Sequence, residues 1–299
     1  MKKVNFLIVS TLVLSSSIFA ATNNSEACKK NNKCNDTKQK CENKTADCLD
    51  KQIAEKMTQC DYEAACKLYF EKLKANKNDA KAKSYYNILK RVVRYEKMYT
   101  KSTNNKQKQK LAAALRNFYY SANNLSGAEK LDKESYSNFK TEANAYRLAA
   151  TQLNLKQYSE SIKTLDSIAP KKMTQNFDIL KAYNYQKLNK AKESTKFLAM
   201  VKVNDLKNPS LLLIGSRIYA LQNNKEKACE LLTKSFELTY PPKLKMVKEY
   251  VANSDEDFKS MRQDTAFLKA LKTKSKVKVS SCSGGSDCGS CKLKNSCNK

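Results

Sequence analysis

The sequence predicts an all-helical protein built from repeated helix pairs, and three observations support this prediction. From about Leu49 to Leu271 the apolar residues recur three and four positions apart, which is typical of amphipathic helices packed on one face. Only 5 Gly and 4 Pro interrupt the chain, too few for the many turns of a strand-rich fold. Short breaks in the apolar pattern recur at a nearly constant spacing. An irregular helical bundle, the alternative fold, does not require such a spacing.

Residues 1–20 have the composition of a secretory signal peptide. Lys2 and Lys3 precede an uncharged, mostly apolar run, and the small residues Ala20 and Ala21 follow it. The run is shorter than the roughly 20 apolar residues of a spanning helix, which makes an uncleaved anchor the weaker alternative. We therefore expect an exported mature chain, periplasmic or extracellular, that does not span a membrane after signal cleavage.

Residues 21–48 form a polar segment rich in Asn, Lys and Cys, and it opens the first of two cysteine clusters. In an exported chain, cysteines gathered in this way indicate disulfides. The candidates are Cys28, Cys34, Cys41, Cys48, Cys60, Cys66, Cys282, Cys288, Cys291 and Cys297. Cys229 stands between the clusters and is expected to be a buried thiol. Because the chain has 11 cysteines, at least one is free or forms an intermolecular disulfide.

Residues 49–240 carry the repeats. A short turn followed by a new helix is expected at Tyr62, Tyr158, Ala191 and Lys225, the last three of which are 33 and 34 residues apart. Tyr95 lies 33 residues after Tyr62 and extends the same period. Three residues after each of the four starts comes a small side chain that would let two helices pack closely, at Ala65, Ser161, Ser194 and Ala228.

These segments resemble the tetratricopeptide (TPR) repeat family, in which two helices form a unit of about 34 residues. The residues Asn154-Leu-Lys-Gln-Tyr158 and Leu188-Asn-Lys190 look like the turn between the family's helices A and B, with Lys or Asn in place of the usual Gly. The resemblance is good around residues 140–240 and poor from 80 to 130. It implies a right-handed α-solenoid. The disulfide-linked Sel-one-like repeats are a minor alternative, from which the low Gly content departs.

The TPR resemblance also implies a partner-binding groove lined by helix A side chains. By register, Tyr146, Tyr183, Lys187 and Arg217 would face that groove. The alternative is that the tyrosines belong to the core and the two basic residues to a solvated face. The implied function is a non-enzymatic scaffold that binds a protein or peptide of the cell envelope or secreted space.

Residues 241–273 are expected to form closing helices, of which 255–271 resembles the helix that ends many bacterial TPR arrays and covers the apolar face of the last repeat. Residues 274–299 form a tail rich in Lys, Gly, Ser and Cys. Both tails are expected to be disordered unless disulfides link them. Around Cys288 and Cys291, disulfides are favoured over a soft-metal site or a thiol-redox pair.

The net charge of +28 favours anionic partners, and the loss of Lys2 and Lys3 with the signal lowers it by 2 to +26. Binding to a polyanion or an acidic envelope polymer is therefore the alternative function. A general richness in lysine is the preferred explanation, because the lysines are spread along the helices. No motif for specific nucleic-acid recognition accompanies the charge.

The chain contains no histidine and no Gly-rich phosphate loop. This composition excludes histidine-dependent nucleophilic catalysis and histidine-ligated metal sites. We expect no enzyme activity, no cofactor and no resident metal.

Overall fold

The computed structural model describes residues 46–278, which are helical throughout apart from turns and connections. The all-helical prediction is confirmed over this range. The chain divides into two compact units, at the boundary between Asn204 and Asp205. The expected signal peptide and most of both cysteine-rich segments lie outside the described residues.

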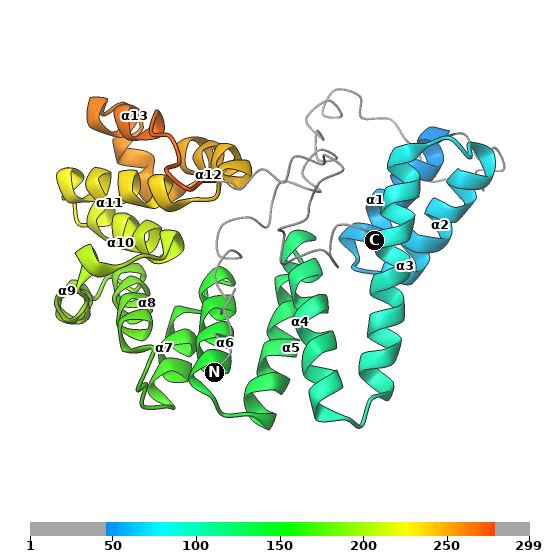
Figure 1. Ribbon diagram of the computed structural model, residues 1–299, viewed down its shortest axis with the longest axis horizontal. Helices are drawn as coiled ribbons and strands as arrows, with labels where there is room; N and C mark the ends of the chain where they lie inside the picture. Colours follow the sequence, from blue (N-terminus) through cyan, green and yellow to red (C-terminus); the bar gives the residue numbers. More distant parts are fainter. Residues whose placement is uncertain (1–45, 279–299) are drawn as a thin grey trace, which may run out of the picture. The chain divides into compact units, whose positions relative to one another are not determined.

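The first unit contains nine α-helices that pack in sequential order, each against the next (Figure 1). They are α1 (Ala46–Thr58), α2 (Tyr62–Ala75), α3 (Ala80–Lys101), α4 (Asn105–Ser121), α5 (Leu125–Asn138), α6 (Glu142–Asn154), α7 (Tyr158–Asp166), α8 (Thr174–Lys187) and α9 (Ala191–Met200).

The second unit follows a short 3-10 turn, η3 (Val203–Asp205), at the boundary. It contains α10 (Pro209–Leu221), α11 (Lys225–Leu238), α12 (Pro241–Asn253), the 3-10 helix η4 (Glu256–Met261) and α13 (Thr265–Leu271). The segment expected to be one closing helix is therefore broken into η4 and α13. The carboxylates of Asp255 and Asp264 accept backbone hydrogen bonds at the start of each.

A left-handed backbone turn joins the two helices of each pair. It lies at Cys60, Asn123, Lys156, Asn189 and Asn223, where φ is between 57° and 60°. In every case this residue's N–H donates to the carbonyl three positions earlier, and the next N–H donates to the carbonyl five positions before itself. These bonds satisfy the last carbonyls of the first helix while the chain reverses. The last four turns are 33, 33 and 34 residues apart, so the repeat period is confirmed there.

The second helix of each pair starts where the sequence predicted for α2, α7, α9 and α11. The small residues expected at the close contacts are completely buried: Ala65, Ser161, Ser194 and Ala228 are all 0% exposed. Ser161 also donates a hydrogen bond of 2.8 Å to the carbonyl of Ala149 on the preceding helix. The remaining pair, α4 and α5, has a completely buried small residue at the same place, Ala128, which sequence analysis missed.

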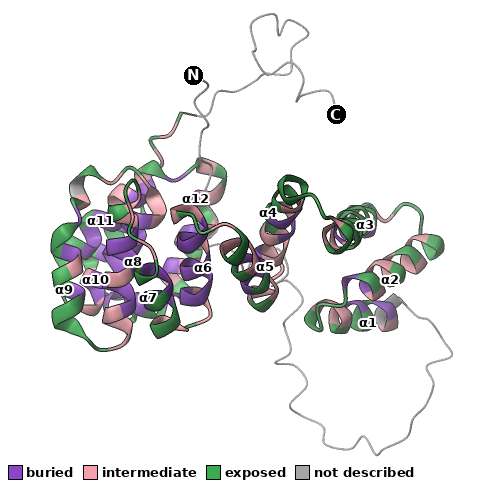
Figure 2. Cartoon of the chain, turned by 90° about the horizontal axis from the view of Figure 1, so that it is seen from below, coloured by how far each residue is buried: buried purple, intermediate pink, exposed green. Residues whose placement is uncertain are grey.

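Burial is uneven within the first unit. Buried residues are dense on α6 and α8, whereas α3 has three among its 22 residues (Figure 2). In the second unit α10 is buried along most of its length, and α13 packs against α11 with Phe267 only 1% exposed. The closing segment therefore packs on the last helix pair, through α13 on α11 and η4 on α10.

Candidate binding surface on α3

Helix α3 is the place where the helix-pair pattern is interrupted. The left-handed turns at Cys60 and Asn123 are 63 residues apart, close to two periods, yet only α2, α3 and α4 lie between them. Tyr95, which lies one period after Tyr62, does not start a helix but lies inside an uninterrupted α3. One helix of 22 residues, about 33 Å long, thus replaces a helix pair.

The local sequence explains why the chain does not turn there. A turn one period after Cys60 would require a positive φ at Val93, and a β-branched side chain strongly disfavours that conformation. The segment Leu89-Lys-Arg-Val-Val-Arg94 contains no Gly, Asn or Asp that would tolerate it. The helix therefore continues, and within residues 46–278 no second helix folds back over its outer face.

The inner face of α3 is held against its neighbours by apolar packing and by carboxylate–tyrosine hydrogen bonds. Leu89 and Val92 are 1% and 5% exposed and belong to a core shared with α2, α4 and α5. Tyr119 on α4 donates a hydrogen bond of 2.7 Å to Glu96. Burial raises the pKa of Glu96, and the bond from Tyr119 opposes that rise. These contacts fix the rotation of α3 about its axis.

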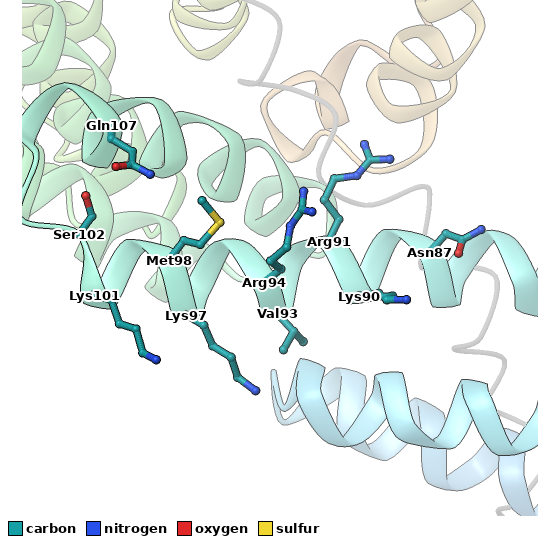
Figure 3. A pocket seen from close by; sticks show the side chains of 10 residues that line it. All are labelled: Asn87, Lys90, Arg91, Val93, Arg94, Lys97, Met98, Lys101, Ser102 and Gln107. Carbon is teal, nitrogen blue, oxygen red and sulfur yellow. The ribbon is translucent and has the colours of Figure 1, made fainter.

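The opposite face of α3 forms a basic groove, by which we mean a surface cavity of about 1020 Å³ lined mostly by this helix. Ten described residues line it; five of these side chains are cationic, and none of the ten is acidic or aromatic. In Figure 3, Arg91 and Arg94 leave α3 on one side, and Lys97 and Lys101 leave it on the other. The lining residues are Asn87, Lys90, Arg91, Val93, Arg94, Lys97, Met98, Lys101, Ser102 and Gln107.

The cations of the basic groove have little local neutralisation. Within the described residues one ion pair reaches them, between Lys97 Nζ and Glu63 Oε1 of α2 at 3.0 Å. The hydrogen bond from Lys97, followed by its charge, lowers the pKa of Glu63. Lys90 lies over the ring of Tyr86 at 5.7 Å, a contact that leaves its charge intact. The groove therefore carries a strong positive potential along three helical turns.

Sequence analysis missed this groove because it considered the lysines evenly spread. The signal was nevertheless present. Positions 87, 90, 94, 97 and 101 are three or four apart, as are 87, 91, 94, 98 and 101, so the two overlapping rows fall on one face of a continuous helix. The assumption of a turn near Tyr95 broke that face in two and concealed the pattern.

The residues expected in a TPR groove lie mostly in the interior. Tyr146, Tyr183 and Arg217 are 2%, 6% and 5% exposed, and Lys187 is half-buried near the end of α8. Arg217 is not on a solvated face, since its Nε donates to Asp255 Oδ2 at 2.7 Å. Burial favours the core interpretation of the tyrosines, and the role of the four in a groove stays a prediction.

The described cysteines include free thiols. Cys60 is exposed, Cys66 is half-buried and Cys229 is buried, all three as free thiols. Burial raises the pKa of Cys66 and of Cys229. Cys48 accepts a hydrogen bond from Gln52 at 3.6 Å. The remaining disulfide candidates lie outside residues 46–278, so their pairing stays a prediction.

Within residues 46–278, no three His, Cys, Asp or Glu side chains gather as metal ligands would. In the same range no helix has the length and apolar character needed to cross a membrane. No protein-family model, curated protein or solved structure matches this chain.

Proposed function

We propose that this chain is an exported, non-enzymatic scaffold of TPR-like repeats that holds an anionic partner protein on the basic groove of α3. The observation that carries the proposal is the gathering of five cations on a long helix, α3, whose outer face is covered by no second helix of the part of the chain that the structure describes. The helix pairs of the first unit, which repeat the same turn geometry, support this surface.

The site differs from the groove implied by the TPR resemblance. Side chains such as Tyr146 and Arg217 have little surface to offer a partner. The α3 cations are exposed and lie on a helix whose rotation is fixed by contacts on its inner face. The helix that carries these cations is already folded and packed along its inner face. Little additional conformational entropy is therefore lost on binding, which suits selective recognition.

Binding to a non-protein polyanion is the second candidate, since the same charge would attract it. Ionic strength separates the two. Polyanion binding relies on counterion release and should collapse between low and moderate salt, whereas a partner protein with additional apolar contacts should be retained.

The test is a pull-down from the envelope fraction with the mature chain and two charge-reversal variants. Lys90→Glu/Arg94→Glu/Lys97→Glu changes the groove. Lys192→Glu/Lys196→Glu/Lys202→Glu changes the net charge equally at exposed positions in or just after α9. We expect a protein that the wild type and the control variant retain at moderate salt and the groove variant loses.

Recovery of the same proteins by all three chains would contradict the proposal. A parallel pull-down under reducing conditions shows whether an intermolecular disulfide contributes, as the odd number of cysteines suggests. Metal binding or redox chemistry by Cys288 and Cys291 remains a separate prediction. Mass spectrometry of the intact mature chain, which distinguishes bridged, metal-bound and free thiols, tests it.

A further inference from the structure

The spacing of cations along α3 restricts the shape of the partner segment. Lys90, Arg94, Lys97 and Lys101 follow one another at intervals of four, three and four residues. On a helix this places one cation per turn, about 5.4 Å apart along the axis, over roughly 16 Å. Arg94 lies on one flank of this row, and Lys97 and Lys101 lie on the other (Figure 3). Any occupant that pairs with all four must present negative charge with the same repeat.

An extended peptide does not keep this repeat. Side chains on one face of a strand recur about every 6.6 Å, which is more than 1 Å longer than a helical turn. Over the three intervals the mismatch grows to roughly 4 Å, so an acidic strand loses contact at one end of the groove. A partner helix has the same rise per turn as α3 and stays in register throughout.

The structure already contains one contact of this kind. Glu63 on α2 reaches Lys97 on α3 at 3.0 Å, as an ion pair between two adjacent helices. The side chain of Lys97 is itself 59% exposed in this pair, so it can still reach another acceptor. A second acidic helix could therefore pair with these cations by the same geometry.

The uncharged lining supports a helical peptide over a nucleic acid. Val93 lies half-buried in the groove, and Met98 is 38% exposed, so apolar side chains accompany the cations. Apolar residues of an amphipathic helix would bury against them. Single-stranded nucleic acids are usually held by stacking on aromatic rings, and none of the ten lining residues is aromatic.

The chain itself is a poor source of the occupant. Residues 272–278 carry four lysines and no acidic residue, and the whole chain has a charge of +28. The same repulsion opposes a second copy. Complementary charge must come from a different molecule.

We propose that the basic groove of α3 binds an acidic amphipathic helix of a partner protein, with carboxylates three and four residues apart. This inference rests on the proposed function and narrows it from an anionic partner to one secondary structure. The partner helix would lie along α3 and bury its apolar residues against Val93 and Met98.

The test uses two peptides of identical composition, each about 18 residues long and helical by circular dichroism. One places Glu at intervals of four, three and four residues beside an apolar stripe, and the other distributes the same Glu residues around the helix. Binding to the full mature chain is measured by fluorescence anisotropy. Four ion pairs of ordinary exposed strength correspond to about tenfold tighter binding of the striped peptide.

The groove variant Lys90→Glu/Arg94→Glu/Lys97→Glu should abolish that preference, and Lys192→Glu/Lys196→Glu/Lys202→Glu should retain it. Equal affinity for both peptides, lost in the groove variant, would refute the helical register and leave the proposed function standing. Tight binding of duplex DNA or polyphosphate in place of either peptide would refute the peptide occupant. If the groove variant and the control variant bound the striped peptide with equal affinity, the site itself would be refuted.

Discussion

At the residue scale, the turns between paired helices depend on a backbone conformation that costs free energy for most side chains. Asparagine tolerates a positive φ comparatively well, and it occupies three of the five turns. Lys156, with φ of 60°, has no such compensation. The turn between α6 and α7 is therefore strained by its side chain.

Replacing Lys156 by glycine should stabilise the protein. Relief of the left-handed strain, less the greater flexibility of glycine in the unfolded chain, gives an increase of about 0.5–1 kcal/mol in the free energy of unfolding. The measurement is chemical denaturation followed by circular dichroism. As a control, Lys163→Gly in the middle of α7 should destabilise by about 1 kcal/mol, and a loss of stability in Lys156→Gly would contradict the strain argument.

Sequence reasoning predicted the environment of some individual residues and not of others. The small residues of the close contacts could be predicted because their register follows directly from the period. The environment of Arg217 could not, since its partner Asp255 is 38 residues away and belongs to the closing segment. Register alone places a residue on a helix face without saying what covers that face.

At the element scale, one carboxylate organises the connection between α7 and α8. Glu142, at the start of α6, accepts hydrogen bonds from the backbone N–H groups of Lys171, Lys172 and Met173 at 2.8, 3.0 and 2.9 Å. These bonds, that of Lys171 foremost, lower the pKa of Glu142 below its usual 4.5. The charge also lies next to the N-terminus of α8, where it is favourable.

This arrangement predicts an acid sensitivity with a definite sign. A carboxylate whose pKa is lower in the folded state stabilises the fold above its unfolded pKa, and that contribution is lost as the pH falls through the folded pKa. Glu142→Gln should melt at a lower temperature than the wild type at about pH 7, and the difference should shrink towards about pH 3. Melting curves of the two chains at both pH values measure it.

Glu193→Gln, at an exposed position in the first turn of α9, is the matched control, because it also removes one carboxylate near the start of a helix; it should lower the melting temperature at about pH 7 less than Glu142→Gln does. If the melting temperatures of Glu142→Gln and the wild type differed equally at both pH values, the charge of Glu142 would not be responsible. Glutamine keeps one acceptor oxygen and replaces the other, which Glu142 also uses, with a donor. The part of the melting-temperature difference that disappears at low pH is therefore the part due to the charge.

The number and order of helices could be predicted where the expected reversal falls on a residue that can adopt a positive φ, and not where it falls on a β-branched residue. Asn189 and Asn223 mark two turns that the sequence anticipated. Around Val93 the expected turn has no residue able to make it, and the period alone was misleading. The observed turns have Cys, Asn or Lys at the position of positive φ, whereas position 93 has a β-branched valine, and this difference would have identified α3 as one helix.

At the scale of the whole molecule, the excess of positive charge opposes folding by self-repulsion. Within 22 residues α3 carries seven cations and one carboxylate, Glu96, which faces the core. At low ionic strength these like charges are poorly screened, because the Debye length is then about 30 Å. Added salt should therefore stabilise this protein.

The melting temperature should rise by a few degrees, about 3–5 °C, between roughly 10 mM and 300 mM sodium chloride. Lys90→Glu/Arg94→Glu/Lys97→Glu should show a smaller rise than Lys192→Glu/Lys196→Glu/Lys202→Glu, although both lower the net charge equally. Differential scanning calorimetry provides the values. A melting temperature that falls with salt in all three chains would mean that attractive ion pairs outweigh the repulsion.

The single-sided packing of α3 has a consequence for motion. A helix with only three buried residues along 22 gains less from tertiary contacts than α6 or α10, so it should open locally at a lower free energy than its neighbours. Its amides should exchange with deuterated solvent earlier than those of α6. A bound partner would slow that exchange, making the deuterium uptake of residues 80–101 a direct record of occupancy.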